Sequence, residues 1–477
     1  MAETLKHKTL RGTVWSSIER FSVQGIMFVV MIIMARILTP ADYGLVGMLT
    51  IFIAISQTLV DSGFSNALIR KQDRTETDNS TVFYFNIAVA ALLYLILALC
   101  APLIARFYNE PQLTELTRVI GLSIVISSFA GVQRALLTVD IDFRTQAKAS
   151  LTAAVVSGAV GIAMAYSGFG VWAIVWCQLT NQGVNCLLLW VLSKWRPRLL
   201  YSWRSFRELF TFGSKLAASG LLDTLYNNIY LLVIGKVFKA SDLGYYTRAQ
   251  QFASFPSSNL TGIFQRVTFP VLCTIQDDDE RLRSVYRRFL RLSAFVVFPL
   301  MVGLAVVAHP LVLLLLKEQW IFAATLLSIL CFSMMWFPIH AINLNLLMVK
   351  GRSDLFLKLE IIKKLIGVGI LCITVPLGLI PMTVGSIVIC ILCLAVNTHY
   401  TGRLIHVGFW MQMRDICPSL LYSLTMGAVV WLITMLFNSP WLQLIVGVLS
   451  GAAYYLLATY LTHSADLREL ISFIRNR

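Results

Sequence analysis

Long apolar runs recur along this chain of 477 residues from one end to the other. Hydrophobic residues make up 57% of the sequence and charged residues only 13%, whereas charged residues account for about 25% of an ordinary soluble domain. A run of about 20 apolar residues is long enough to cross the hydrocarbon core of a bilayer as one helix. The sequence therefore predicts an all-α integral membrane protein with about fourteen transmembrane helices. The predicted spans cover 12–38, 42–69, 79–107, 112–140, 147–167, 169–193, 211–238, 242–272, 284–316, 319–349, 353–377, 380–405, 416–437 and 439–461.

The basic residues predict how the chain lies in the membrane. Lys and Arg gather in the N-terminal tail and in every second link between spans, above all in 193–210 and 274–291. Cytoplasmic links of membrane proteins carry such an excess of Lys and Arg. We therefore expect both termini in the cytoplasm and the short link at 108–112 on the opposite side. Anionic lipid headgroups are sufficient partners for the formal net charge of +15, so we expect no nucleic-acid partner.

One short motif occurs twice, first as ARILTPADYGLVG at 35–47 and again as GKVFKASDLGYYT at 235–247. The alignment pairs Asp42 with Asp242 and Gly44 with Gly244. We expect each aspartate to cap the helix that follows, by accepting backbone N–H bonds. We expect each glycine to relieve crowding where two helices meet closely. The repeated motif is interpreted as a structural turn rather than a catalytic one.

The positions of the two copies predict how the chain is organised. The motif follows the first and the seventh predicted spans, so the repeating unit is six helices. Because six is an even number, both copies begin on the same side of the membrane, and the lobes are parallel repeats with a substrate path between them. We expect an N-terminal six-helix lobe at 1–203, a second six-helix lobe at 204–405, and two additional helices with a cytoplasmic tail at 406–477.

The motif ARILTPADYG and its second copy DLGYYTRAQQF resemble the polysaccharide-exporter branch of the multidrug/oligosaccharidyl-lipid/polysaccharide (MOP) flippase superfamily. Within that branch the chain is similar to the Wzx-type, colanic-acid-exporter-like group, over essentially its whole length. The resemblance implies two six-helix lobes in a V around a central cavity, and alternating access. It also implies that the protein flips undecaprenyl-pyrophosphate-linked oligosaccharide across the bacterial inner membrane, for exopolysaccharide, capsule or O-antigen biosynthesis.

Charged residues within the apolar spans are the candidate site residues. Each costs about 2.5–3.5 kcal/mol at the centre of a membrane helix, so each needs a reason. We interpret the basic ones as lining a wet cavity between the lobes, where they compensate the charge of a pyrophosphate. The alternative is that these charges pair with acidic neighbours such as Glu360 and hold helices together. The pyrophosphate candidates are Arg20, Arg134, Lys215, Arg266, Lys363 and Lys364.

Two acidic residues, Asp61 and Asp223, are the candidates for binding a coupling proton or sodium ion. Asp223 lies near the middle of the seventh predicted span, on a polar face with Ser219 and Asn227 at helical spacing. A carboxylate at that depth can reach water from each side in turn if the lobes alternate.

Motifs for other chemistries are missing from the sequence or have ordinary explanations. The chain has neither a G-x-x-x-x-G-K-[ST] phosphate loop, nor H-E-x-x-H, nor G-x-S-x-G. The acidic run at 277–280 lies beside Arg281 and Arg283 and is interpreted as a solvated charge cluster rather than a metal site. Cys390 and Cys393 lie in an apolar span and are interpreted as small core residues. We therefore expect no enzymatic activity, no cofactor and no bound metal.

Two other functions stay open. A drug or cation antiporter of the same superfamily would have a mainly acidic or aromatic cavity, whereas the buried charges here lean basic. A membrane polysaccharide polymerase or ligase would need a larger outer loop to hold a glycan acceptor. For a flippase, the expected partners are the lipid-linked oligosaccharide, membrane lipids and other polysaccharide-assembly proteins.

Overall fold

The computed structural model describes residues 2–61, 64–464 and 466–469. In these residues the chain forms nineteen α-helices and two short 3-10 helices, and no strand. It divides into two compact units, Met1–Gly244 and Tyr245–Arg477, each of which is described by itself. The predicted all-α membrane fold is thereby confirmed.

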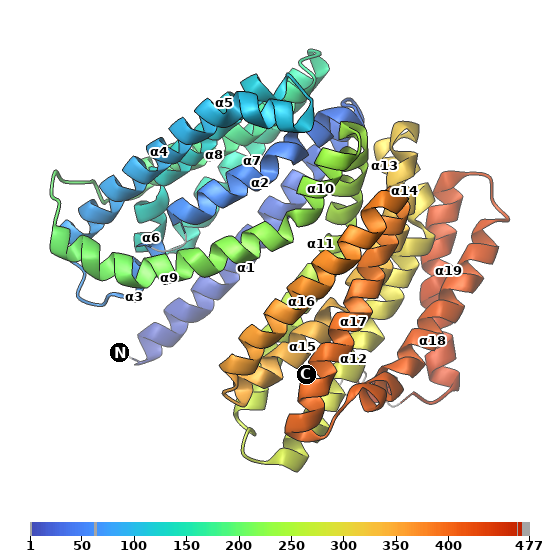
Figure 1. The fold of residues 1–477 in the computed structure, drawn as a ribbon. Coiled ribbons are helices and arrows are strands. Elements are labelled where there is room, and N and C mark those ends of the chain that lie inside the picture. The colour runs from blue at the N-terminus through green and yellow to red at the C-terminus, as the bar shows by residue number, and fades with distance from the viewer. Residues whose placement is uncertain (1, 62–63, 465, 470–477) are drawn as a thin grey trace. The chain divides into compact units, whose positions relative to one another are not determined.

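The first unit is built from α1 to α10 (Figure 1). Its helices are α1 (Ala2–Ala35), α2 (Pro40–Asp61), α3 (Phe64–Arg70), α4 (Glu76–Tyr108), α5 (Leu113–Ser128), α6 (Gly131–Val139), α7 (Phe143–Tyr166), α8 (Val171–Leu192), α9 (Trp203–Asn227) and α10 (Ile229–Val237). Helix α11 (Ala240–Cys273) begins in this unit and continues into the next.

Small residues let α1, α7 and α8 pack closely. Helix α7 packs against both α1 and α8 (Figure 1). Its buried face is made almost entirely of Ala, Ser and Gly. A Cβ on Gly158 would overlap Val30 of α1, and one on Gly161 would press on Cys177 of α8. Small residues allow such close approach between membrane helices, where packing and hydrogen bonds rather than the hydrophobic effect hold helices together.

The link between the predicted lobes is fastened to the first unit. The backbone N–H of Arg198 donates to the hydroxyl of Ser80 (3.2 Å), and that of Ser202 donates to the hydroxyl of Thr81 (3.1 Å). Lys71 bridges Asp78 of α4 and Glu208 of α9, at 3.2 Å to each. Burial by itself would lower the pKa of Lys71, but the hydrogen bonds with the two carboxylates raise it above its usual value. The beginning of α9 is therefore held on α4.

Helices α9 and α10 then run along α2 (Figure 1). The hydroxyls of Thr58 and Thr224 are hydrogen-bonded at 2.9 Å, and a Cβ on Gly235 would lie 3.0 Å from Met48. This packing places the seventh predicted span in the first compact unit, which ends at Gly244. The lobe boundary at 203/204 concerns the sequence repeat and stays a prediction.

The two copies of the repeated motif meet each other in the first unit. A Cβ on Gly44 would overlap the carbonyl oxygen of Ala240, and a Cβ on Gly244 would overlap the carbonyl oxygen of Pro40. Each glycine thus lies against the first residue of the helix that the other copy begins. The contact is reciprocal. Each copy of the motif contributes one glycine, which packs against a backbone carbonyl of the other copy.

Both aspartates of the motif lie inside the first helical turn, not at the N-cap. Asp42 accepts the backbone N–H of Thr39 at 2.8 Å and its hydroxyl at 2.7 Å, while Thr39 accepts the N–H of Asp42 at 3.3 Å. This is a capping box in which the carboxylate reaches back to the residue before the helix. In the second copy Lys239 replaces the threonine, and the bond from its N–H to Asp242 is 3.2 Å.

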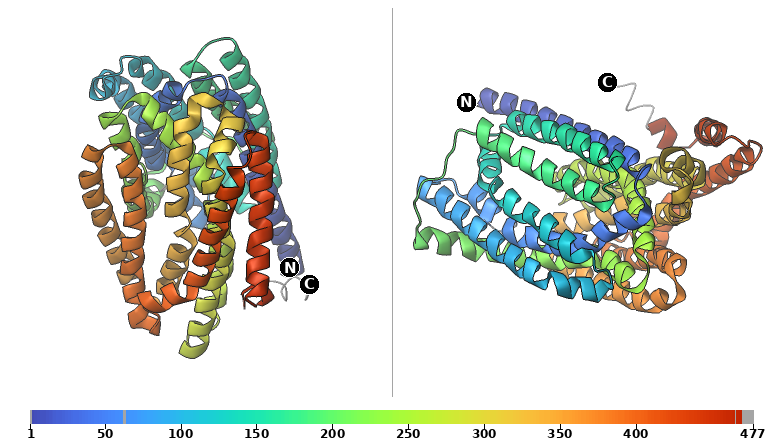
Figure 2. Two further views of the ribbon diagram at one scale, coloured as in Figure 1. Left: turned by 90° about the vertical axis from the view of Figure 1, so that its right-hand side faces the viewer. Right: turned by 90° about the horizontal axis from the view of Figure 1, so that it is seen from above.

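The second unit contains the rest of α11 and eight further α-helices. They are α12 (Asp279–Val306), α13 (Ala308–Leu316), α14 (Ile321–Met334), α15 (Phe337–Val349), α16 (Ser353–Thr374), α17 (Leu379–Ile405), α18 (Phe409–Thr434) and α19 (Pro440–Leu461), with the 3-10 helices η1 (Glu318–Trp320) and η2 (Val375–Leu377). Helices α16 and α17 form one hairpin, and α18 and α19 form another (Figure 2).

Polar groups connect the helices of the second unit. Arg287 of α12 forms a bidentate ion pair with Asp415 of α18, with both N–O distances at 2.6 Å. The Asn343 amide of α15 donates to Gln412 of α18 at 3.0 Å, and Gln412 in turn donates to Thr401 of α17 at 3.0 Å. Such interhelical bonds satisfy polar groups that a membrane interior cannot hydrate.

Within the described residues, ten helical segments are long and apolar enough to cross a membrane. Helices α8, α9, α11 and α16 coincide with predicted spans and are also long, but are not among those ten. The count of fourteen transmembrane helices stays a prediction. Several predicted spans are broken in the structure, for example 112–140 between α5 and α6, and 319–349 between α14 and α15.

We expect Gly44→Ala and Gly244→Ala each to destabilise the protein by about 1–3 kcal/mol, because the added methyl overlaps backbone rather than a flexible side chain. The measurement is the thermal midpoint of the detergent-purified protein, together with its amount in the membrane. Gly183→Ala in α8 is the matched control, since a Cβ there meets nothing within 4 Å. Midpoints of the two motif variants equal to that of Gly183→Ala would contradict the close contact.

Candidate functional site

A polar pocket of about 360 Å³ lies in the first unit among α1, α6, α7 and α8. Its volume is within the range of about 300–1,000 Å³ that is typical of small-molecule sites. Except for two apolar side chains, the residues that line it carry amide, hydroxyl or charged groups. They are Glu19, Val23, Arg134, Gln146, Ser150, Asn181, Gln182, Asn185 and Leu189.

A chain of hydrogen bonds connects the acidic and the basic side chain of the pocket. The Ser150 hydroxyl donates to Glu19 Oε1 at 2.7 Å. The Asn185 amide donates to the Ser150 hydroxyl at 3.4 Å, and its oxygen accepts from Arg134 Nη2 at 3.0 Å. Glu19 and Arg134 therefore face one pocket with a serine and an asparagine between them. Four helices contribute to this arrangement, and the hydrogen bonds orient each side chain.

Other side chains of the pocket keep hydrogen-bonding capacity open. Gln146 donates to Thr138 at 3.1 Å, and Asn181 donates to Ser157 at 3.1 Å, through their amide nitrogens. Within the described part of the chain, the carboxamide of Gln182 makes no hydrogen bond, and the guanidinium of Arg134 makes only the one to Asn185. Arg134 is exposed, so ligands can reach it from outside the helices.

The fold explains the position of the pocket. Ser150 lies seven residues after the start of α7, and Asn185 lies seven residues before the end of α8. At 1.5 Å per residue, both are about 10 Å from the same end of the α7–α8 hairpin. That end is the predicted cytoplasmic one. On the predicted topology, the pocket is expected to lie near the cytoplasmic membrane surface but within the span.

Among the pyrophosphate candidates whose side chains the structure describes, Arg134 alone lines this pocket. Arg20 is exposed on α1, and Arg266 is exposed on α11 in the second unit. Lys363 forms an ion pair with Glu360 on α16, and Lys364 lies beside it in sequence. For Lys363, the structure thus favours the alternative interpretation, in which a charge within a span pairs with an acidic neighbour.

The acidic candidates belong to two helices that are in contact. Asp223 is exposed on α9, next to Thr224, which bonds to Thr58 of α2. Asp61 is the last residue of α2. The side chains of Asp61 and Lys215 lie outside the described part of the structure.

Sequence reasoning missed the carboxamides of the pocket. Gln178, Asn181, Gln182 and Asn185 follow one another at spacings of three, one and three residues in α8, which places them on one helical face. Three of these four line the pocket. A polar face on an otherwise apolar span was the signal that would have found them.

The acidic run and the Cys-x-x-Cys pair have structural roles. Asp278 caps α12 by accepting the N–H of Arg281 at 3.0 Å, and Asp279 pairs with Lys350 at 2.8 Å. Cys390 and Cys393 are buried free thiols. Among the described residues there is no cluster of three or more His, Cys, Asp or Glu side chains that could hold a metal ion.

Solved structures with the same fold are membrane transporters. The lipid II flippase MurJ in an inward closed conformation superposes with a TM-score of 0.75, covering 97% of this chain and 100% of that chain at 14% identity. An inward-facing multidrug resistance MATE family transporter of the MOP superfamily superposes with a TM-score of 0.62, covering 82% and 98% at 18% identity. The chain therefore has the fold of the MOP superfamily.

Three relatives are named for the biosynthesis of a polysaccharide. The lipopolysaccharide biosynthesis protein WzxC of Escherichia coli (strain K12) is 26% identical over 89% of both chains. The succinoglycan biosynthesis transport protein ExoT of Rhizobium meliloti (strain 1021) is 24% identical over 100% of this chain and 98% of its own. The teichuronic acid biosynthesis protein TuaB of Bacillus subtilis (strain 168) is 27% identical over 74% of this chain and 73% of its own.

The family described as "Polysaccharide biosynthesis protein" matches residues 33–325. The matched segment includes both copies of the repeated motif and all of the pocket except Glu19 and Val23 of α1. It also covers more than half of the chain. The protein is therefore a member of this polysaccharide biosynthesis family.

Proposed function

We propose that this protein is a flippase that moves lipid-linked oligosaccharide repeat units across the membrane for polysaccharide biosynthesis. The observation that carries the proposal is the combination of family and fold. Relatives named for polysaccharide biosynthesis and transport match the chain over nearly its whole length, and it shares its fold with a lipid II flippase. The likenesses to the lipid II flippase and to a multidrug transporter are both ones of fold alone, so the named relatives favour the flippase over the antiporter.

The finer proposal is that the lipid carrier is undecaprenyl pyrophosphate and that the membrane is the bacterial inner membrane. A pyrophosphate crossing the bilayer loses water that must be replaced by donors and positive charge. Arg20 and Arg266 are exposed cations within predicted spans, one in each unit. With Lys215 and Lys364, they are proposed to compensate the phosphates in stages while access alternates between the two sides.

Catalysis is not part of this proposal. Transport is named directly in the relative ExoT, and flipping in the structural neighbour MurJ. Movement of a substrate needs binding groups that are released again, and the pocket of the first unit consists of such groups, namely amides, a hydroxyl and one charge of each sign.

The test of the proposed function is the fate of lipid-linked intermediates in a deletion strain. We expect polysaccharide export to stop and lipid-linked repeat units to accumulate, because assembly continues while transfer across the membrane does not. Lipid extraction with mass spectrometry measures the intermediates, and re-expression of the wild-type chain should remove them. Normal export without accumulation in the deletion strain would rule out the flippase.

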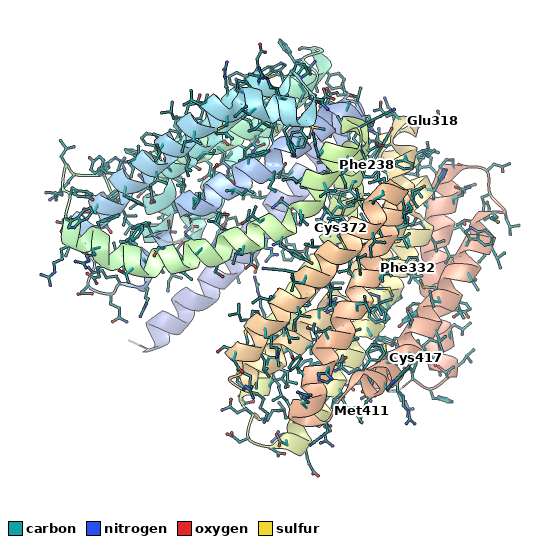
Figure 3. All side chains as sticks on the ribbon, viewed as in Figure 1. Phe238, Glu318, Phe332, Cys372, Met411 and Cys417 are labelled. Atoms are coloured by element: carbon teal, nitrogen blue, oxygen red, sulfur yellow. The ribbon has the colours of Figure 1, made fainter. Side chains whose placement is uncertain are left out.

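The predicted topology is testable at two exposed positions. Leu199 is 93% exposed in the link before α9, and Gln112 is exposed in the link before α5. In a cysteine-free background, we expect Gln112→Cys but not Leu199→Cys to react with an impermeant maleimide applied from outside. The background must lack the exposed native thiols Cys372 and Cys417 (Figure 3). Labelling of Leu199→Cys from outside in intact cells would contradict the predicted cytoplasmic position of this link.

Energy coupling is proposed to use a proton or sodium gradient, with Asp223 as the coupling carboxylate and Asp61 as the second candidate. We expect Asp223→Asn to reduce gradient-driven flipping in proteoliposomes more than exchange without a gradient, because an amide cannot release a proton or neutralise a cation. Asn227→Ala, one turn further along α9 and also exposed, is the matched control. An Asp223→Asn protein with the full gradient response would remove this residue from the coupling mechanism.

A further inference from the structure

We propose that the pocket formed by α1, α6, α7 and α8 is a sugar subsite that takes a hydroxyl-rich sugar residue bearing one carboxylate, as in a hexuronic acid. This inference rests on the proposed function, because it assigns a part of the same oligosaccharide substrate to a defined place in the first unit. It assigns Arg134 to a sugar carboxylate, whereas the other basic candidates are left for the pyrophosphate.

The charge of the pocket argues against a pyrophosphate there. The residues that line it include one acidic and one basic side chain, Glu19 and Arg134. A pyrophosphate carries about two negative charges and only accepts hydrogen bonds, so it would have to lie beside the Glu19 carboxylate with a single cation for compensation. A ligand with one negative charge is repelled less by Glu19 and is balanced by the single cation, and its hydroxyls can donate to the Glu19 carboxylate.

The hydrogen-bonding groups of the pocket match hydroxyls. The pocket offers acceptors as well as donors: the Glu19 carboxylate, the oxygens of Asn181 and Gln182, and the free amide of Gln182. A sugar hydroxyl donates one hydrogen bond and accepts others, so it pairs with both kinds of group. Carboxamides serve this purpose well, because each presents a donor and an acceptor at a fixed separation.

Arg134 is the residue that would distinguish an acidic sugar from a neutral one. Its Nη2 atom donates to Asn185 at 3.0 Å, and the remaining N–H groups of the guanidinium make no hydrogen bond to the described residues. An arginine whose guanidinium is hydrogen-bonded through one nitrogen can bind a carboxylate with its other N–H groups. The bond from Ser150 to Glu19, at 2.7 Å, keeps the competing carboxylate oriented towards α7 instead of Arg134.

The experiment uses the full chain, purified and reconstituted in lipid nanodiscs, with three small probes. Saturation-transfer NMR measures the binding of glucuronate, of glucose as its neutral counterpart, and of inorganic pyrophosphate as a competitor. We expect glucuronate to bind the wild-type chain and to bind Arg134→Gln at least about tenfold more weakly, since a charge-assisted contact is lost. Glucose should bind more weakly than glucuronate and respond little to Arg134→Gln.

A second variant tests the same pocket without removing a hydrogen bond between helices, so that a folding defect of Arg134→Gln does not decide the result. Gln182→Ala removes a carboxamide that holds no helix in place, and it should also weaken glucuronate binding. Gln178→Ala is the matched control on the same helix, because Gln178 is outside the residues that line the pocket. Arg118→Gln, an exposed arginine of α5, is the control for loss of charge. Both controls should bind glucuronate as the wild-type chain does.

Three results would overturn the assignment. Pyrophosphate that displaces glucuronate in the wild-type chain and itself depends on Arg134 would identify a phosphate site. Glucose that binds as well as glucuronate, regardless of Arg134, would exclude an acidic sugar. Absence of binding by both sugars would exclude a sugar subsite. The deletion-strain experiment is separate, so a failure of the flippase proposal would be recognised by normal export, whatever the outcome of these binding measurements.

Discussion

The reciprocal contact between the two copies of one turn is the constraint on which the first unit depends. Gly44 and Gly244 each bring a helix start against a backbone carbonyl, at a distance that leaves no room for a Cβ. From this contact α10 and α9 run back along α2, with Gly235 beside Met48 and Thr224 beside Thr58. The first span of the second sequence repeat is thereby packed against the second span of the first. The duplicated motif is explained by this contact, because each copy accommodates the other.

Polar groups inside the helix bundles differ in how fully they are paired. In the second unit, Nε and Nη2 of Arg287 donate to the two carboxylate oxygens of Asp415, and Gln412 is bonded through both the oxygen and the nitrogen of its amide. In the pocket of the first unit, Gln182 and most of the Arg134 guanidinium hold no partner among the described residues. Because open groups that face a pocket are available to a ligand, we propose those of the first unit as the binding groups.

A flippase has to bind its cargo and then release it on the other side. Groups already engaged in strong ion pairs are poor candidates for that task, because the substrate would have to break the pair. We therefore propose Lys363, which is paired with Glu360, as a weaker candidate for a phosphate ligand than Arg20 or Arg266, whose side chains are exposed. The sequence left two interpretations open for all these charges together: that they line a cavity, or that they pair and hold helices together. The choice between the two has to be made for each residue.

The sequence by itself determined the class of fold, the repeat and the resemblance to polysaccharide exporters. Apolar runs, the distribution of Lys and Arg, and a short motif that recurs with its Asp and Gly in step are local patterns, which need no knowledge of neighbours in space. The tertiary structure decided which polar side chains meet. Glu19, Arg134, Ser150 and Asn185 come from four different helices, and no helical spacing relates them. Only the rotation and depth of each packed helix, set by small residues such as Gly158 and Gly161, bring them into one pocket.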